Sequence, residues 1–202
     1  MSASAGDRPE TTTRDRIVRG AAQLIRTQGV SGTGMRDVVA FADAPRGSLQ
    51  HYFPGGKDQL VCEALLWSGD ASGRLVRYLC RAMDAPTPVQ LLAELVGWWR
   101  NDLLSNGFEA GCPLVAAAVE VTAGSDAMRA VISEALDHWQ GPIAEVLEQM
   151  GVPGARATNL AVLMLSTLEG AIVLARIRHD VAPLDVVVDE LTPVFEHAND
   201  RS

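Results

Sequence analysis

Apolar residues recur at helical spacing along nearly the whole chain. In the segment 12–29, the apolar residues that share one helical face are Ile17, Ala21, Leu24 and Ile25. Thr12 followed by Asp15 resembles a capping box that opens this helix, and Gly29 is placed to end it. The preceding residues 1–11 are rich in Ser, Ala, Gly, Asp and Pro and predict a flexible arm.

Two short helical patterns follow and are separated by a tight turn. The apolar residues of the first pattern, at i, i+3, i+4 and i+7, are Met35, Val38, Val39 and Ala42. The run Asp-Ala-Pro at 43–45 ends that helix, and Leu49 and Phe53 give a second helix its inward face. Thr33 is a candidate cap for the first helix of the pair. With the preceding helix, the pair predicts a three-helix domain over residues 12–57 that contains a helix-turn-helix.

Polar side chains remain for the outer surface of this pair. Arg46 and Gln50 can form bidentate hydrogen bonds to guanine and adenine, and Gly47 allows close approach of the backbone. No acidic side chain interrupts the outward face of the second helix. The candidate DNA-contacting residues are Arg36, Pro45, Arg46, Gly47, Ser48, Gln50, His51, Tyr52 and Lys57. On periodicity alone, an ordinary pair of packed helices with a polar outer surface remains an alternative.

Charge is divided unevenly along the chain. The formal net charge is -8, but residues 1–57 contain eight basic and five acidic side chains, which leaves +3 on this part and -11 on the remainder. Phosphate neutralisation is local and screened over about 8–10 Å, so a basic N-terminal part can bind DNA within an acidic protein. The acidic body limits unspecific binding or simply keeps the protein soluble.

The helix-turn-helix segment resembles the tetracycline-repressor (TetR) family of bacterial transcription regulators. The family signature runs roughly T-x-R-D-I-A, a short turn, then G-T-L-Y-x-H-F and a lysine; here the letters are M-R-D-V-V-A and then G-S-L-Q-H-Y-F-P-G-G-K. The phrases FPGGKDQL, AGCPL and LEGAIVLAR resemble the LmrA/YxaF-type branch. The resemblance implies a repressor that binds palindromic operator DNA as a homodimer and answers to small, largely apolar molecules.

Two positions depart from the family pattern. Gln50 stands where a tyrosine commonly contacts the DNA backbone, which favours a base-reading role for this residue. The segment 54–57, Pro-Gly-Gly-Lys, is one residue longer than the usual link, and its glycines relax the backbone before the next helix. Lys57 should still reach a phosphate. We expect a DNA specificity that differs accordingly.

Residues 58–202 predict a helical body without a convincing strand. A helix of some seven turns starts at Asp58, and shorter patterns predict further helices at about 88–104, 113–122, 126–150, 154–178 and 184–196. Pro142 lies inside one of them and predicts a kink that frees the carbonyl of His138 and borders a cavity. The predicted fold is therefore all-α, with an N-terminal helix-turn-helix domain and a helical C-terminal ligand-binding and dimerisation domain.

The segment 160–175 is apolar on nearly every side, which a small monomer cannot fully bury. Its small-residue edge, formed by Thr167, Ala171 and Ala175, predicts a helix partner. The family resemblance places the last two long helices in a homodimer interface, and a two-fold dimer spaces two DNA-reading domains about 34–36 Å apart. A central core helix in a monomer is the alternative. The stretch is shorter than the roughly 18 residues of a membrane span, so no membrane partner is expected.

Half of the ten aromatic residues are Trp67, Trp98, Trp99, Phe108 and Trp139, all in the body. We expect some of them to line a ligand cavity, although core packing explains most tryptophans. The further candidates for this cavity are Cys112, Val115, Val119, Met164 and Leu168, with His138 or Glu169 as a polar anchor. His179 is expected to interact with the C-terminal end of its helix. The family resemblance implies that effector binding moves the two DNA-binding domains apart, with the helix that starts near Asp58 as the lever.

The three cysteines Cys62, Cys80 and Cys112 show no metal-ligand spacing and follow no secretory signal. We therefore expect core thiols in the reducing cytoplasm, with no metal and no cofactor. An enzyme is a weak rival interpretation, because the sequence has no phosphate loop or serine elbow, and Cys112 needs a base near it in space. A second rival is a dimeric small-molecule carrier whose helix-turn-helix no longer binds DNA.

Overall fold

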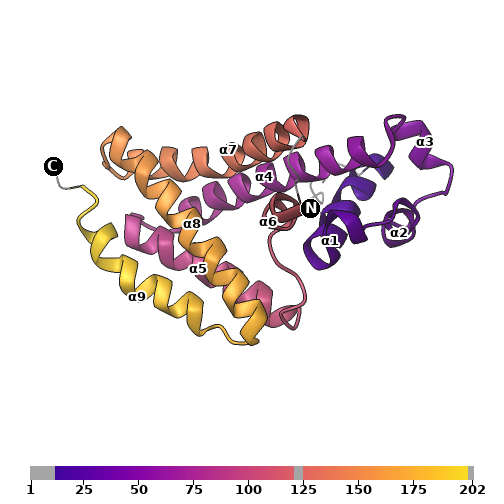
Figure 1. Ribbon diagram of the computed structural model, residues 1–202. Helices are drawn as coiled ribbons and strands as arrows, with labels where there is room; N and C mark the ends of the chain where they lie inside the picture. Colours follow the sequence, from indigo (N-terminus) through magenta and orange to yellow (C-terminus); the bar gives the residue numbers. More distant parts are fainter. Residues whose placement is uncertain (1–11, 121–124, 200–202) are drawn as a thin grey trace, which may run out of the picture.

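The computed structural model describes residues 12–120 and 125–199, and over these ranges every regular element is a helix (Figure 1). The helices are α1 (Thr13–Gly32), α2 (Met35–Phe41), α3 (Ser48–Tyr52), α4 (Gly56–Ala82), α5 (Pro88–Ser105), α6 (Pro113–Glu120), α7 (Asp126–Gln149), α8 (Gly154–Arg178) and α9 (Ala182–Glu196). The all-α prediction is confirmed. The expected arm at 1–11 and the last two residues of the helix expected at 113–122 lie outside the described residues.

The N-terminal domain consists of α1, α2 and α3 around a small core. Ile17 and Val38 are fully buried in it, and Phe53 is 1% exposed. The capping box at Thr12 is present as predicted, and Gly29 interrupts α1 with a φ of 75°. The prediction that Thr33 caps α2 is wrong, because its hydroxyl donates to the carbonyl of Gly29 at 2.6 Å and closes α1 instead.

α4 leads from the N-terminal domain into the body and lies along α7 (Figure 1). The two helices approach closely where α4 carries glycine. A Cβ atom at Gly69 would lie 2.1 Å from the carbonyl oxygen of Ala135, and one at Gly73 would lie 2.4 Å from that of His138. α7 continues through Pro142, so Gly73 faces the carbonyl that this proline leaves without its helical donor.

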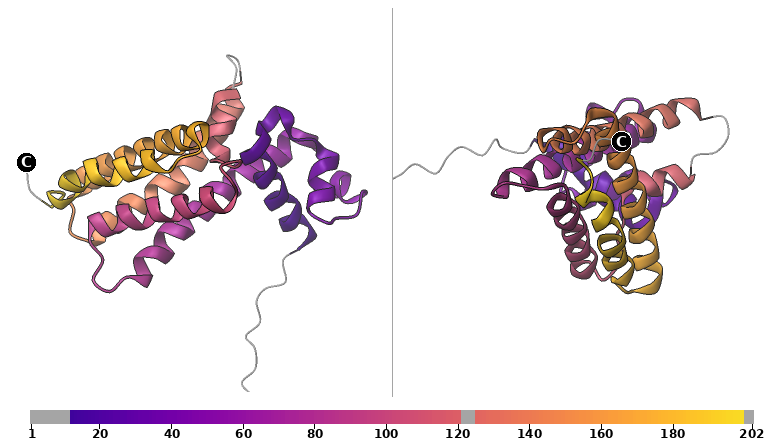
Figure 2. Two further views of the ribbon diagram at one scale, coloured as in Figure 1. Left: turned by 90° about the horizontal axis from the view of Figure 1, so that it is seen from below. Right: turned by 90° about the vertical axis from the view of Figure 1, so that its left-hand side faces the viewer.

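α8 and α9 lie side by side in the body, away from the indigo N-terminal helices (Figure 2). The small-residue edge predicted on α8 is wrong, because Ala171 and Ala175 are 4% and 0% exposed and face the core. The opposite side of α8 carries an uncovered stripe that consists of Val162, Leu163, Ser166, Gly170, Val173, Leu174 and Ile177.

Within the described ranges, α8 is the one helix whose length and composition would allow it to cross a membrane. It extends over 25 residues and is longer than the apolar stretch on which the sequence argument relied. Half of its most apolar window is buried inside the protein. Packing in the core therefore accounts for the apolar character of one side of α8, and the uncovered stripe requires another explanation.

Candidate nucleic-acid interface and adjoining cavity

α2 and α3 meet at the turn that the sequence predicted. Asp43 has a left-handed backbone conformation with a φ of 47°, and the amide of Ser48 donates to the carbonyl of Pro45 at 2.9 Å. α3 begins at Ser48, so Arg46 and Gly47 lie in the turn. The side chain of Arg46 is exposed, as predicted.

The candidate DNA-contacting residues are accessible to different degrees. Those that are exposed are Arg36, Pro45, Arg46, Gly47, Gln50 and His51, and those that are half-buried are Ser48, Tyr52 and Lys57. Arg36 and Arg46 border a hollow beside α2 that Asp37 also lines. Asp37 of α2 brings a carboxylate beside the two arginines, whereas residues 46–52 contain no acidic side chain.

Lys57 lies in the first turn of α4 and contacts the end of α1. Its Nζ donates to the carbonyl oxygen of Ser31 at 3.4 Å. An ammonium group has three donors, so this single contact leaves Lys57 capacity for a phosphate. The contact also fixes the start of α4 against α1, which orients the side chain.

Glu120 at the end of α6 joins the body to the N-terminal domain. Its Oε1 accepts from the amide of Val30 at 2.8 Å, and its Oε2 accepts from the amide of Ser31 at 2.7 Å. These amides follow the interruption of α1 at Gly29. Partial burial raises the pKa of Glu120, but hydrogen bonds from Ser31 and Val30 outweigh it and leave the pKa below its ordinary value. Sequence analysis missed this residue, because its partners lie far away in the chain.

Arg26 of α1 forms a second connection between the two parts. Its Nε donates to the carbonyl of Gly111 at 2.8 Å, and the amide of Gly111 donates back to the carbonyl of Arg26 at 3.0 Å. The guanidinium also forms an ion pair with Asp102 of α5 and lies over the ring of Trp99, 5.7 Å from its centroid. α1 is therefore tied both to α5 and to the segment before α6.

The segment between α5 and α6 is in turn tied to α8. Nη2 of Arg176 donates to the carbonyl of Glu109 at 2.7 Å. The ring of Phe108, whose φ is 65°, lies against that of His179, with 5.5 Å between the ring centroids. His179 lies at the C-terminal end of α8, where the sequence placed it. This segment thus contacts α1 on one side and α8 on the other.

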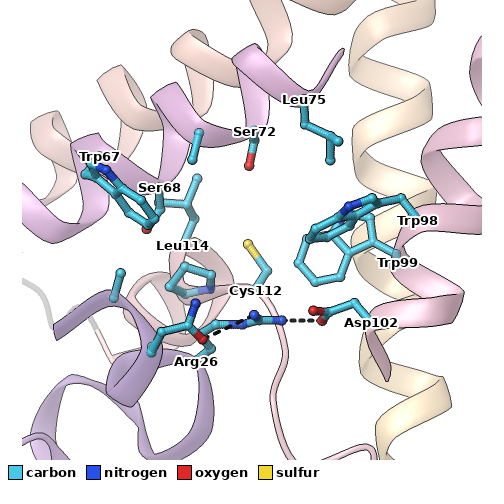
Figure 3. Close-up of a pocket in the computed structure, with 14 residues that line it drawn as sticks. Arg26, Trp67, Ser68, Ser72, Leu75, Trp98, Trp99, Asp102, Cys112 and Leu114 are labelled. Carbon is cyan, nitrogen blue, oxygen red and sulfur yellow. Dashed lines mark hydrogen bonds and ion pairs between the residues drawn. The ribbon is translucent and has the colours of Figure 1, made fainter. Parts of the chain in front are cut away.

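A cavity of about 280 Å³ lies where α1 of the N-terminal domain meets the body (Figure 3). Its walls come from α1, α4, α5 and the start of α6. The lining residues are Ala22, Gln23, Arg26, Trp67, Ser68, Ala71, Ser72, Leu75, Trp98, Trp99, Asp102, Cys112, Pro113 and Leu114. In Figure 3 the sulfur of Cys112 points into the space between Ser72 and the paired rings of Trp98 and Trp99. The cavity is mainly apolar and aromatic, with the ion pair of Arg26 and Asp102 at one side.

Two family models match separate parts of the chain. The model of bacterial regulatory proteins of the tetR family matches residues 17–64, and the C-terminal domain of LmrA/YxaF-like transcriptional regulators matches residues 88–190, about half of the chain. The chain belongs to the TetR family. Both the family and the LmrA/YxaF-like branch predicted from the sequence are confirmed, and the N-terminal match covers the helix-turn-helix.

Individual relatives agree with this TetR-family assignment. An uncharacterized HTH-type transcriptional regulator of Mycobacterium tuberculosis is 43% identical over 183 residues, which cover 88% of this chain and 91% of that protein. YxaF of Bacillus subtilis is 28% identical over 179 residues, covering 88% and 92%. A TetR-family regulator from Cytophaga hutchinsonii has the same fold, with a TM-score of 0.74, 22% identity and coverage of 94% and 96%.

This TetR-family protein is a transcriptional regulator and not an enzyme, like the relatives it matches. The structure explains why Cys112 is a poor nucleophile although an acid–base group lies beside it. Burial raises the pKa of the Cys112 thiol well above its ordinary value, and the neighbouring Glu169 raises it further. A thiol that keeps its proton does not attack efficiently.

The cavity of this TetR-family regulator contains four of the predicted ligand contacts: Trp67, Trp98, Trp99 and Cys112. The other predicted residues do not line it. Trp139, Met164 and Leu168 are buried in the core, Val115 is half-buried against it, and Val119 is 79% exposed. His138 lies near the surface with its Nδ1 3.0 Å from Oδ1 of Asp70, and Phe108 contacts His179.

The wall contributed by α1 was missed, because the sequence assigned that helix to DNA binding alone. Ala22, Gln23 and Arg26 form this wall. The expected border at Pro142 is wrong, since none of the described lining residues comes from α7. Glu169 is buried beside Cys112, just behind the lining.

Proposed function

We propose that this regulator is a cytoplasmic repressor, which binds a palindromic operator as a homodimer and is released when a small, largely apolar effector enters the cavity. The observation that carries this proposal is the position of the cavity. One wall is α1 of the DNA-binding domain, and another is α4, which begins just after α3. A ligand there contacts the elements that orient the DNA-binding domain.

For DNA recognition, we assign base reading to Arg46, Ser48 and Gln50. Arg46 and Gln50 are exposed at the turn and on α3, and their side chains suit guanine and adenine edges. The remaining candidates, which position the protein on the backbone, are Arg36, Pro45, Gly47, His51, Tyr52 and Lys57. The charge of +3 on residues 1–57 supports this assignment.

For dimerisation, we assign the uncovered stripe of α8 together with the adjoining surface of α9. Val173 and Leu174 are 43% and 46% exposed in the single chain, and Ile177 is 81% exposed. Val186 of α9 adds a further exposed apolar side chain, at 57%. A helix face of this kind is buried when a second copy of the chain packs on it by two-fold symmetry.

We assign the response to the effector, which leads to release of operator DNA, to the connection between α1 and the body. Arg26 lines the cavity and also holds Asp102 and Gly111, so a ligand that displaces its side chain changes how α1 is attached. A coupling of about 1–3 kcal/mol changes operator affinity roughly 5- to 150-fold, which is sufficient for control of transcription.

Selection of bound DNA from random and genomic fragments, followed by footprinting and a salt titration, tests the proposal. We expect an inverted repeat whose half-sites lie about 34–36 Å apart, and an affinity that falls with rising salt. Failure to enrich any inverted repeat would refute operator binding. Enrichment of a repeat by a protein that stays monomeric at the binding concentration would refute the homodimer.

A further inference from the structure

Glu169 of α8 is a buried carboxyl group whose polar contact among the described residues is the thiol of Cys112. Its side chain is 9% exposed, and the one donor beside the carboxyl group is the Cys112 thiol. Burial raises the pKa of Glu169, and this weak donor lowers it only partly. Buried polar groups of proteins are nearly always paired, and an unpaired carboxylate is especially costly. A thiol is a weak donor for a buried carboxylate, so a stronger partner, such as a ligand, would satisfy the group better.

Glu169 lies next to the cavity. The Cys112 thiol is beside the carboxyl group, and the same Cys112 side chain lines the cavity and points into it (Figure 3). Cys112 is also the one titratable neighbour that the described structure brings to Glu169. Cys112 therefore contacts both the cavity and the carboxyl group.

The charges around the cavity favour a cation. Arg26 and Asp102 neutralise one another in their ion pair, while the guanidinium of Arg19 lies over the ring of Trp67, 5.7 Å from its centroid. Glu169 is the carboxyl group behind the wall that has no ion-pair partner among the described residues. The rings of Trp67, Trp98 and Trp99 form much of the remaining surface. Aromatic faces attract cations and also suit an aromatic ligand.

We infer that the cavity accepts an aromatic effector carrying one cationic nitrogen, with the ring system among the tryptophans and the nitrogen on the Cys112 side, facing Glu169. This inference rests on the proposed function of the cavity as the effector site. It also limits ligand size, because about 280 Å³ is near the lower end of small-molecule sites.

Three probes that share one ring skeleton test the inference by calorimetry on the full chain: 1-naphthylmethylamine, 1-naphthylmethanol and 1-naphthoate. At pH 8 we expect the ammonium probe to bind about tenfold more tightly than the alcohol, and the carboxylate to bind most weakly. In Glu169→Gln the preference for the ammonium probe should disappear, while the affinity for the alcohol stays within about twofold. Glu94→Gln, at an exposed glutamate of α5, is the matched control and should keep the preference.

A pH titration of the wild-type protein provides a test that does not depend on the folding of a variant. Burial raises the pKa of Glu169 to about 7, and a bound cation stabilises the ionised form. Affinity for the ammonium probe should therefore rise between about pH 6 and 8, while affinity for the alcohol stays flat. A flat profile for the ammonium probe would contradict the inference.

The remaining outcomes separate this inference from the proposed function. Equal binding of all three probes, tightest binding of the naphthoate, or no binding at all would overturn the ligand chemistry while leaving operator selection unaffected. If the ammonium probe binds as expected but operator DNA stays bound at saturating probe, the ligand chemistry stands and the proposed release mechanism fails.

Discussion

Oε2 of Glu120 on α6 accepts a hydrogen bond from the amide of Ser31 at the end of α1, over 2.7 Å. The same carboxylate holds the amide of Val30 and the hydroxyl of Ser31. This one side chain thus accepts hydrogen bonds from the backbone amides that follow the interruption of α1 at Gly29. It thereby connects the DNA-binding domain to α6.

Removal of this carboxylate should destabilise the protein. We expect Glu120→Ala to lower the free energy of unfolding by about 1–2 kcal/mol, because two backbone amides lose their acceptor. Urea unfolding measures this difference, and hydrogen exchange should show faster exchange at the amides of Val30 and Ser31. Glu94→Ala, at an exposed glutamate of α5, is the control and should change neither quantity.

Acid should weaken the same connection. Partial burial raises the pKa of Glu120, but hydrogen bonds from Ser31 and Val30 leave it below the ordinary value. Because the folded-state pKa is lowered, the stabilisation is present above the ordinary glutamate pKa and is lost as pH falls through the folded value. The stability difference between wild type and Glu120→Gln should therefore shrink below about pH 4. A difference that stays constant down to acid unfolding would contradict this assignment.

Two glycines of the DNA-binding domain should differ in how alanine at their positions affects stability. At Gly29, with a φ of 75°, a Cβ atom would lie 2.0 Å from Oε1 of Glu120, so Gly29→Ala should cost more than about 1 kcal/mol of stability. Gly47 has a φ of -74°, and a Cβ atom there would meet no neighbouring group within 4 Å, so Gly47→Ala should unfold at the wild-type urea concentration. If the DNA backbone approaches Gly47 closely, this variant should nevertheless bind operator more weakly. Wild-type operator affinity in Gly47→Ala would refute the close approach.

The helices could be predicted because their signals are local. The capping box at Thr12, the break at Asp43 and the apolar spacing of α2 each act within a few residues of sequence. The cavity could be predicted only in part, because α1, α4, α5 and the start of α6 contribute to it from distant parts of the chain. Aromatic content pointed to Trp67 and Trp98, whereas nothing in the local sequence around Arg26 pairs it with Asp102.

The outward side of α8 illustrates the same limit. Composition alone indicated a helix with more apolar surface than a monomer can bury, and this is what the fold shows. Which edge remains uncovered depends on how α8 packs against α7 and α9. The small residues Ala171 and Ala175 are used in that packing, so the larger side chains of Val173 and Leu174 face outward.

Substitutions of base-reading residues and of phosphate-contacting residues should reduce DNA-binding affinity in different patterns across operator variants. Arg46→Ala and Gln50→Ala should each reduce discrimination at one position of the operator, with a cost of about 1–3 kcal/mol on the matched site. Lys57→Ala should weaken binding about equally on matched and mismatched sites. It should also reduce the slope of log affinity against log salt concentration by about one. Binding titrations on an operator and its single-base variants measure both effects. Equal losses on all sites for the three variants would contradict the assigned roles.

A charge on the uncovered stripe of α8 should prevent dimerisation without unfolding the chain. Leu174 is 46% exposed in the single chain, so Leu174→Arg places its guanidinium in solvent in a monomer but inside the interface of a dimer. Leu104 on α5 is exposed to a similar extent, at 50%, and lies off the stripe, which makes Leu104→Arg the matched control. Sedimentation velocity should show a monomer for Leu174→Arg and a dimer for Leu104→Arg, with helical circular dichroism retained in both.

Because two linked DNA-binding domains are required for tight binding to an inverted repeat, Leu174→Arg should also lose affinity for the full operator while its affinity for a half-site is unchanged. A dimeric Leu174→Arg protein would place the interface elsewhere on the molecule.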